Sequence, residues 1–167
     1  MHEMFTSPTY GQLNMEQIAE HILQFYRTHV QYGEAIDIIV GTDSQNFSDT
    51  KMVNVITVVC HGHGGIFFYH IHHLHRLNDV VAKLYTETEE SLKITAELVK
   101  ILESKPQYEE LYLHCSISIH VDAGNSQSGK TRELIPQLVG WITACGYDCA
   151  VKPDSFAASS IADKISK

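Results

Sequence analysis

Long apolar runs are missing from this chain of 167 residues. No stretch approaches the roughly 18 consecutive apolar residues that a membrane-spanning helix needs. The opening segment, MHEMFTSPTYGQ, has neither the basic nor the apolar stretch of a signal peptide. We therefore expect no membrane partner and a cytoplasmic location.

Cysteine is also scarce, with four residues in the chain. Cys60 and Cys115 lie within predicted apolar strands, and Cys145 and Cys149 have neither zinc-ligand spacing nor the CxxC arrangement of a redox site. We interpret all four as reduced residues that serve packing, as is usual in a reducing compartment.

Basic residues are outnumbered, 12 against 20 acidic ones, for a formal net charge of -8. This balance excludes a nonspecific polyanion binder, because neutralising phosphates requires Lys and Arg. The imbalance is uneven: residues 1–129 hold 7 basic and 16 acidic side chains, and residues 130–167 hold 5 and 4. A surface for nucleic acid is therefore expected to draw on the C-terminal quarter.

Length and composition predict one compact domain, since internal repeats, low-complexity segments and linkers are all missing. Asn14 and Gln17 form a capping pattern before an amphipathic helix over residues 15–30. We divide the chain into this N-terminal helix, residues 1–34, packed on or extending a core of residues 35–167. The apolar face of the helix leaves a homo-oligomer as an open alternative.

The core is predicted as an α/β fold with a mixed five-stranded sheet flanked by helices. Three strands, at about residues 36–42, 51–60 and 66–74, form an antiparallel meander, and a helix follows from Asn78 to the break at Pro106. Alternating residues predict a strand over 111–121. A helix over 133–145, a strand over 147–152 and a final helix from about Ser155 complete the order.

Acidic residues stand at positions where this fold brings chain segments together. Asp43 ends the first core strand, Asp122 ends the alternating strand on its polar face, and Glu87 is the charged member of an apolar helical stripe. Simpler structural roles are alternatives for these residues. Asp43 and Asp122 could each stabilise a turn after a strand, and Glu89 or Glu90 is an alternative to Glu87 as the helical carboxylate of the site. Asp154 also suits the cap of the last helix.

Besides the order of elements, four segments carry a resemblance to a known family: GTDSQ, KLYTET, GKTR and KPDSFAASSIADK. On these features the chain resembles the ribonuclease H-like superfamily over residues 35–167. Within that superfamily it resembles a bacterial family of small proteins. The resemblance implies a divalent-metal-dependent nuclease that hydrolyses phosphodiester bonds. Its acidic site falls on Asp43, Glu87, Asp122 and Asp154, with Asp163 and Glu90 as alternates. Such close carboxylates suit Mg²⁺ or Mn²⁺, and a pair of these ions about 4 Å apart can activate a water.

A competing motif is GNSQSGKT, residues 124–131, which matches the phosphate loop GxxxxGK[ST]. It predicts a nucleotide hydrolase in which Lys130 and Thr131 contact phosphate and magnesium. Pro136 lies where the helix of such a loop should continue unbroken, and Asp122 places negative charge beside it. We therefore favour a nucleic-acid role for Lys130 and Arg132. A noncatalytic nucleic-acid-binding module with the same fold is a further alternative.

Eleven histidines complete the set of candidate residues. On a strand His70 and His72 share one face and His73 and His75 the other, so the four cannot converge on one metal. His120 shares the polar face of Asp122. The expected substrate-binding residues are Ser44, His120, Lys130 and Arg132. The type of nucleic acid is not indicated by the sequence.

Overall fold

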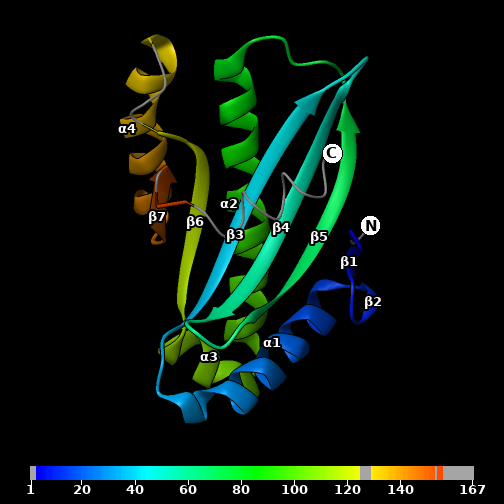
Figure 1. Ribbon diagram of the computed structural model, residues 1–167, viewed down its shortest axis with the longest axis vertical. Coiled ribbons are helices and arrows are strands. Elements are labelled where there is room, and N and C mark those ends of the chain that lie inside the picture. Colours follow the sequence, from blue (N-terminus) through cyan, green and yellow to red (C-terminus); the bar gives the residue numbers. More distant parts are fainter. Residues whose placement is uncertain (1–2, 125–128, 153, 156–167) are drawn as a thin grey trace.

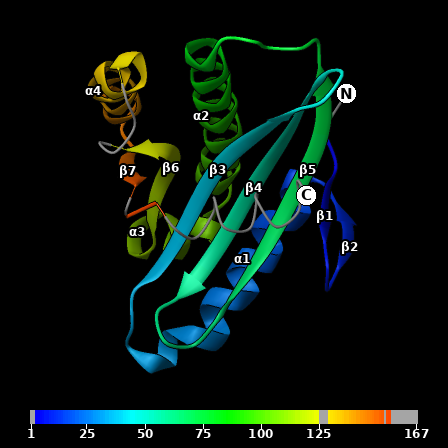
Figure 2. The same ribbon diagram turned by 45° about the horizontal axis from the view of Figure 1, so that its top comes forward.

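The computed structural model describes residues 3–124, 129–152, 154 and 155. These residues form a mixed seven-stranded sheet in the order β2-β1-β5-β4-β3-β6-β7. The helices α1 and α2 lie side by side behind the sheet, and α4 lies beside α2 over β6 and β7 (Figures 1 and 2). The α/β class and the mixed sheet predicted from sequence are confirmed.

The central meander consists of β3 (Ile36–Asn46), β4 (Thr50–Cys60) and β5 (Gly65–Leu74). All three strands pair antiparallel over nearly their whole length. These segments are rich in Ile, Val, Thr and aromatic residues, which fit the pleated and half-buried surface of a sheet. The strand β6 (Ser116–Gly124) then joins β3 in parallel, and β7 (Asp148–Lys152) joins β6 in parallel.

One helix-covered face of the sheet holds the main core. Alternate residues of β3 and β4, among them Ile38 and Ile56, pack against the helices α1 (Met15–His29), α2 (Val80–Ser104) and α4 (Gly129–Ala144). Within the described helices none is long and apolar enough to cross a membrane. On the opposite face Val53 and Val55 form a small separate cluster with Phe67 and Tyr69.

The helix α1 begins as predicted, because Asn14 accepts a hydrogen bond from the backbone of Gln17 and the Gln17 side chain accepts one from Asn14. Its buried residues belong to the same core as those of α2. Two short strands, β1 (Phe5–Ser7) and β2 (Gly11–Leu13), extend the sheet beyond β5. Three residues are too few to show alternation, so sequence reasoning missed both strands.

The predicted strand over 111–121 is wrong in its first half. Residues 106–108 form the 3-10 helix η2, and Glu109–His114 form the helix α3. Tyr108, Leu111 and Cys115 are buried at helical spacing, whereas Tyr112 and Leu113 are exposed. The alternation of Leu111, Leu113 and Cys115 therefore did not reflect a sheet. The strand itself begins at Ser116, and the predicted final helix lies beyond the last described residue.

We predict that Leu98→Ala lowers the free energy of unfolding by about 2–5 kcal/mol, because Leu98 on α2 is fully buried in the main core. Leu113→Ala is the matched control: Leu113 on α3 is 63% exposed, and the change should stay within about 0.5 kcal/mol. Urea unfolding measures both. Equal losses for the two variants would contradict this assignment of the core.

Candidate carboxylate site

Asp43 and Asp122 lie on the adjacent parallel strands β3 and β6. The register pairs Gly41 of β3 with His120 of β6. Asp43 and Asp122 each lie two residues beyond this last pair, at corresponding positions of the two strands. The sheet thus places side by side two acidic residues that are 79 positions apart in the sequence (122 minus 43).

Both aspartates project from the same face of the sheet. Thr42 and Ser44 contact α2 through hydrogen bonds, so Asp43 between them points to the opposite side. On β6 Val121 belongs to the helix-covered core, and Asp122 next to it faces away from that core. An arrangement with the two carboxylates on opposite faces would have removed the basis for a common site.

Glu87 lies on α2, on the side of the sheet opposite to the face from which the two aspartates project, and is electrostatically coupled to both. It is buried, and the hydroxyl of Ser44 donates a hydrogen bond of 2.5 Å to its Oε2. Burial, together with the charges of Asp43 and Asp122, raises the pKa of Glu87 to about 8 against the lowering effects of Ser44 and Lys83. We call Asp43, Glu87 and Asp122 the carboxylate cluster.

The charge of Asp122 is balanced by Lys152 at the end of β7, with 2.9 Å between Nζ and Oδ1. The pair is partly exposed, so solvent screens it and its stabilisation is small. A cavity of only about 10 Å³ lies between α2 and the strands, lined by Glu87, His120 and Asp122 among others. This volume is too small for a phosphodiester group.

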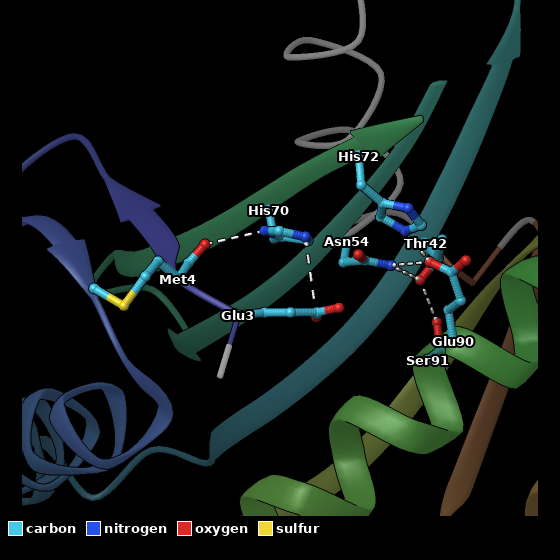
Figure 3. Close-up of polar contacts among 8 residues, drawn as sticks. All are labelled: Glu3, Met4, Thr42, Asn54, His70, His72, Glu90 and Ser91. Atoms are coloured by element: carbon cyan, nitrogen blue, oxygen red, sulfur yellow. Dashed lines mark hydrogen bonds and ion pairs between the residues drawn. The ribbon is translucent and has the colours of Figure 1, made fainter. Parts of the chain in front are cut away.

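Glu90, an alternate for the site, is engaged elsewhere (Figure 3). Its Oε1 accepts a hydrogen bond of 3.0 Å from the Asn54 amide and lies 2.6 Å from Nε2 of His72. The same Asn54 amide donates to the hydroxyl of Thr42, which is hydrogen-bonded to that of Ser91. This polar network fixes α2 against β3 and β4 one turn from Glu87. Glu90 is thus engaged by Asn54 and His72. Glu87, by contrast, feels the charges of Asp43 and Asp122.

The histidines of β5 do not converge. His72 contacts Glu90, whereas Nδ1 of His70 lies 3.0 Å from the carbonyl oxygen of Met4 (Figure 3). Nδ1 of His73 lies 3.0 Å from Oδ2 of Asp49, in the turn between β3 and β4. Each ring therefore has its own partner on a different element.

Of the expected substrate-binding residues, Ser44 is the hydrogen-bond partner of Glu87. His120 is buried on the face of Asp122, and desolvation lowers its pKa, so its imidazole is neutral at pH 7. Arg132 is exposed in the first turn of α4, and Lys130 lies in the same turn. His120 is thus suited to hydrogen bonding rather than to charge neutralisation.

The fourth carboxylate of the sequence prediction stands apart from this geometry. Asp154 is exposed after β7, and its backbone N–H donates to the carbonyl of Val151. The charges that raise the pKa of Glu87 come from Asp43 and Asp122. Asp163, the rival for this place, lies outside the described residues.

The phosphate-loop motif is described only in part, since residues 125–128 fall outside the described chain. The helix α4 runs continuously through Pro136, so the proline does not break it as the sequence argument assumed. Thr131, the expected magnesium ligand of such a loop, is buried. Its burial in the α4 packing gives it a structural role.

A family model described as ribonuclease H-like matches residues 17–167, which is nearly the whole chain. The chain belongs to this ribonuclease H-like family. It is also 25% identical to the uncharacterised protein YkuK of Bacillus subtilis (strain 168), over 98% of this chain and 97% of YkuK. No solved structure gave a significant match. The resemblance drawn from GTDSQ and the order of elements is confirmed.

Ribonuclease H-like proteins often depend on Mg²⁺ or Mn²⁺. The carboxylate cluster fits such ions chemically, because these hard cations prefer oxygen ligands and would relieve the repulsion among the three carboxylates. In the described part of the chain, however, no group of three or more His, Cys, Asp or Glu side chains is arranged to hold a metal ion. The ligands would therefore be drawn from this cluster after local side-chain movement, including release of Asp122 from Lys152.

Sequence reasoning missed Asn54 and Lys152. Asn54 did carry a signal, because it interrupts the apolar run MVNVITVV in β4, and a polar residue in a buried strand is normally hydrogen-bonded. Lys152 had no such signal. Its ion pair depends on the parallel pairing of β6 with β7, which sequence spacing does not reveal.

We predict that Glu87→Gln stabilises the metal-free protein increasingly as pH rises. Between pH 4.5 and about 8 the folded wild type keeps a proton that the unfolded chain has released, so its free energy of unfolding falls across this window. The glutamine side chain does not titrate in this range, and its carbonyl oxygen still accepts the hydrogen bond from the Ser44 hydroxyl. The gain should be small at pH 5 and on the order of 5 kcal/mol at pH 8. Urea unfolding in EDTA measures it, and a gain independent of pH would contradict the shifted pKa.

Proposed function

We propose that this protein is a divalent-metal-dependent nuclease that hydrolyses phosphodiester bonds of a nucleic acid at the carboxylate cluster. The observation that supports this best is the convergence of Asp43 and Asp122 on one face, with buried Glu87 electrostatically coupled to both. Membership of the ribonuclease H-like family supports a nuclease-type or nucleic-acid-binding role at the same place.

Asp43 and Asp122 would be the central metal ligands, with Glu87 as the third and Asp154 or Asp163 as a fourth. Bound divalent ions would supply an activated water and stabilise the developing negative charge on the phosphate. The protein therefore needs no Ser, Cys or His nucleophile. Its own contribution is to hold the carboxylates close together on two strands and a helix.

Neighbouring residues prepare the cluster for this role. Ser44 fixes the carboxyl group of Glu87, and Lys152 neutralises Asp122 in the absence of cations. The neutral ring of His120 and the cations of Lys130 and Arg132 would contact substrate, the latter two through phosphates. Phosphate contacts position a strand without specifying its sequence.

We predict that Asp43→Asn abolishes metal-dependent cleavage while the fold remains intact, because the amide removes a central ligand charge at constant shape. Glu89→Gln is the matched control, since Glu89 is exposed on α2 two residues from Glu87 and lies outside the cluster. Cleavage of labelled RNA, DNA and hybrid substrates with Mn²⁺ measures both, alongside circular dichroism. Retained Mn²⁺-dependent cleavage by pure Asp43→Asn would refute this assignment.

We also predict that Mn²⁺ at 100 times its dissociation constant raises the free energy of unfolding by about 2.7 kcal/mol, because it binds only the folded cluster. The gain should be lost in Asp122→Asn and kept in Lys130→Ala. Thermal shift with and without ATP provides the measurement. Stabilisation only by ATP with Mg²⁺, lost in Lys130→Ala, would instead assign the chain to the nucleotide hydrolases. Nucleic-acid binding without cleavage would mark a noncatalytic module.

A further inference from the structure

The turn between β3 and β4 holds an aromatic ring in solvent. Phe47 is 51% exposed, although its backbone is firmly held. Its N–H donates to the carbonyl of Asp49 at 2.7 Å, and the hydroxyl of Thr50 donates to Asn46 at 2.7 Å across the turn. A Phe side chain kept exposed on a rigid turn is available for contact with a ligand.

The same turn is fastened to the connection between β5 and α2, which passes beside it at the top of the sheet (Figure 1). The Asn46 amide donates to the carbonyl of Leu77, and the Leu77 N–H donates to the hydroxyl of Thr50, both at 2.8 Å. The guanidinium of Arg76 donates to the carbonyl of Phe47. These bonds hold Arg76 and Phe47 together as one preorganised unit.

Two cationic side chains lie at this end of the sheet, in a chain of net charge -8. Arg76 contacts the turn directly. Lys51 pairs with His73 across β4 and β5 and with Gln45 of β3, so it lies on the face from which Asp43 projects. Asp49 lies 3.0 Å from His73. The end of the sheet that carries Phe47 therefore also carries Arg76 and Lys51.

The separation between Asp43 and Phe47 along the chain corresponds to a short stretch of nucleic acid. Phe47 follows Asp43 by four residues, which is roughly 13 Å along a strand. This length corresponds to about four nucleotides of a stacked strand at 3.4 Å each. Gln45 of β3, between Asp43 and Phe47, lies on the same face of the sheet as Asp43.

We propose that Phe47 and Arg76 form a binding site for a single-stranded nucleic acid, with one base stacked on the Phe47 ring and an adjacent phosphate bound by Arg76. Stacking on an aromatic side chain requires an unpaired base, so duplexes are excluded from this site. A lone ring framed by cationic side chains fits a base and its phosphate better than an apolar protein partner. The proposal rests on the proposed function, since it places the strand that the cluster would cleave.

Binding without cleavage tests this site directly. In EDTA, and in an Asp43→Asn background, the affinity for a fluorescein-labelled single-stranded 12-mer, as RNA and as DNA, is measured by anisotropy. Phe47→Ala should weaken binding by about 5-fold to 150-fold, the usual loss for one stacked base. Phe47→Leu should weaken it similarly, because it keeps an apolar side chain and loses the ring face. Phe47→Trp should retain affinity and show quenched indole fluorescence on binding.

Two controls separate stacking from general effects. Tyr112→Ala removes an equally exposed aromatic side chain from α3 and should leave affinity unchanged. Blunt duplex of the same sequence should bind the Phe47→Ala variant and its parent equally. Affinity of Phe47→Ala equal to that of its parent, or full affinity in Phe47→Leu, would overturn the site.

The outcome for this site is distinguishable from that for the nuclease. Cleavage by the wild type with Mn²⁺, combined with unchanged binding by Phe47→Ala, would reject the Phe47 site and keep the nuclease. Loss of binding in Phe47→Ala without any cleavage by the wild type would keep the site and reject the nuclease.

Discussion

Repulsion between Glu87 and the charges of Asp43 and Asp122 is the constraint around which this structure is organised. Asp43 and Asp122 lie on the parallel strands β3 and β6, and Glu87 is buried on α2 at the other side of the sheet. Such repulsion opposes folding unless protons, cations or a lysine compensate it. Protonation of Glu87 and the ion pair between Asp122 and Lys152 provide this compensation in the structure.

Hydrogen bonds between α2 and the sheet stabilise this electrostatically unfavourable position of Glu87. The hydroxyls of Thr42 and Ser91 and the amide of Asn54 form hydrogen bonds beneath the cluster, and Ser44 holds Glu87 itself. These bonds fix α2 against both β3 and β4. The same sheet that gathers the carboxylates continues to the β3–β4 turn with Phe47. The strands β3 and β4 therefore connect the carboxylate cluster with Phe47 and Arg76 at the end of the sheet.

The meander and the long helix could be predicted from sequence, because each follows from strong periodicity. Asp43 and Asp122 could be named as candidates, because each lies at the end of a predicted strand. The helix at residues 109–114 could not be predicted, because Leu111 and Cys115 satisfy strand and helix spacing alike. The role of Lys152 depends on long-range pairing, which local pattern does not contain.

The most direct test of the cluster is an NMR titration of the carboxyl carbons in metal-free protein, with Glu87 assigned by mutation. We expect Glu87 to titrate with a pKa of about 8 and this pKa to fall when either Asp43 or Asp122 is replaced by asparagine. A Glu87 pKa near 4.5, or a raised value unchanged by both replacements, would contradict the electrostatic coupling of Glu87 to the two aspartates.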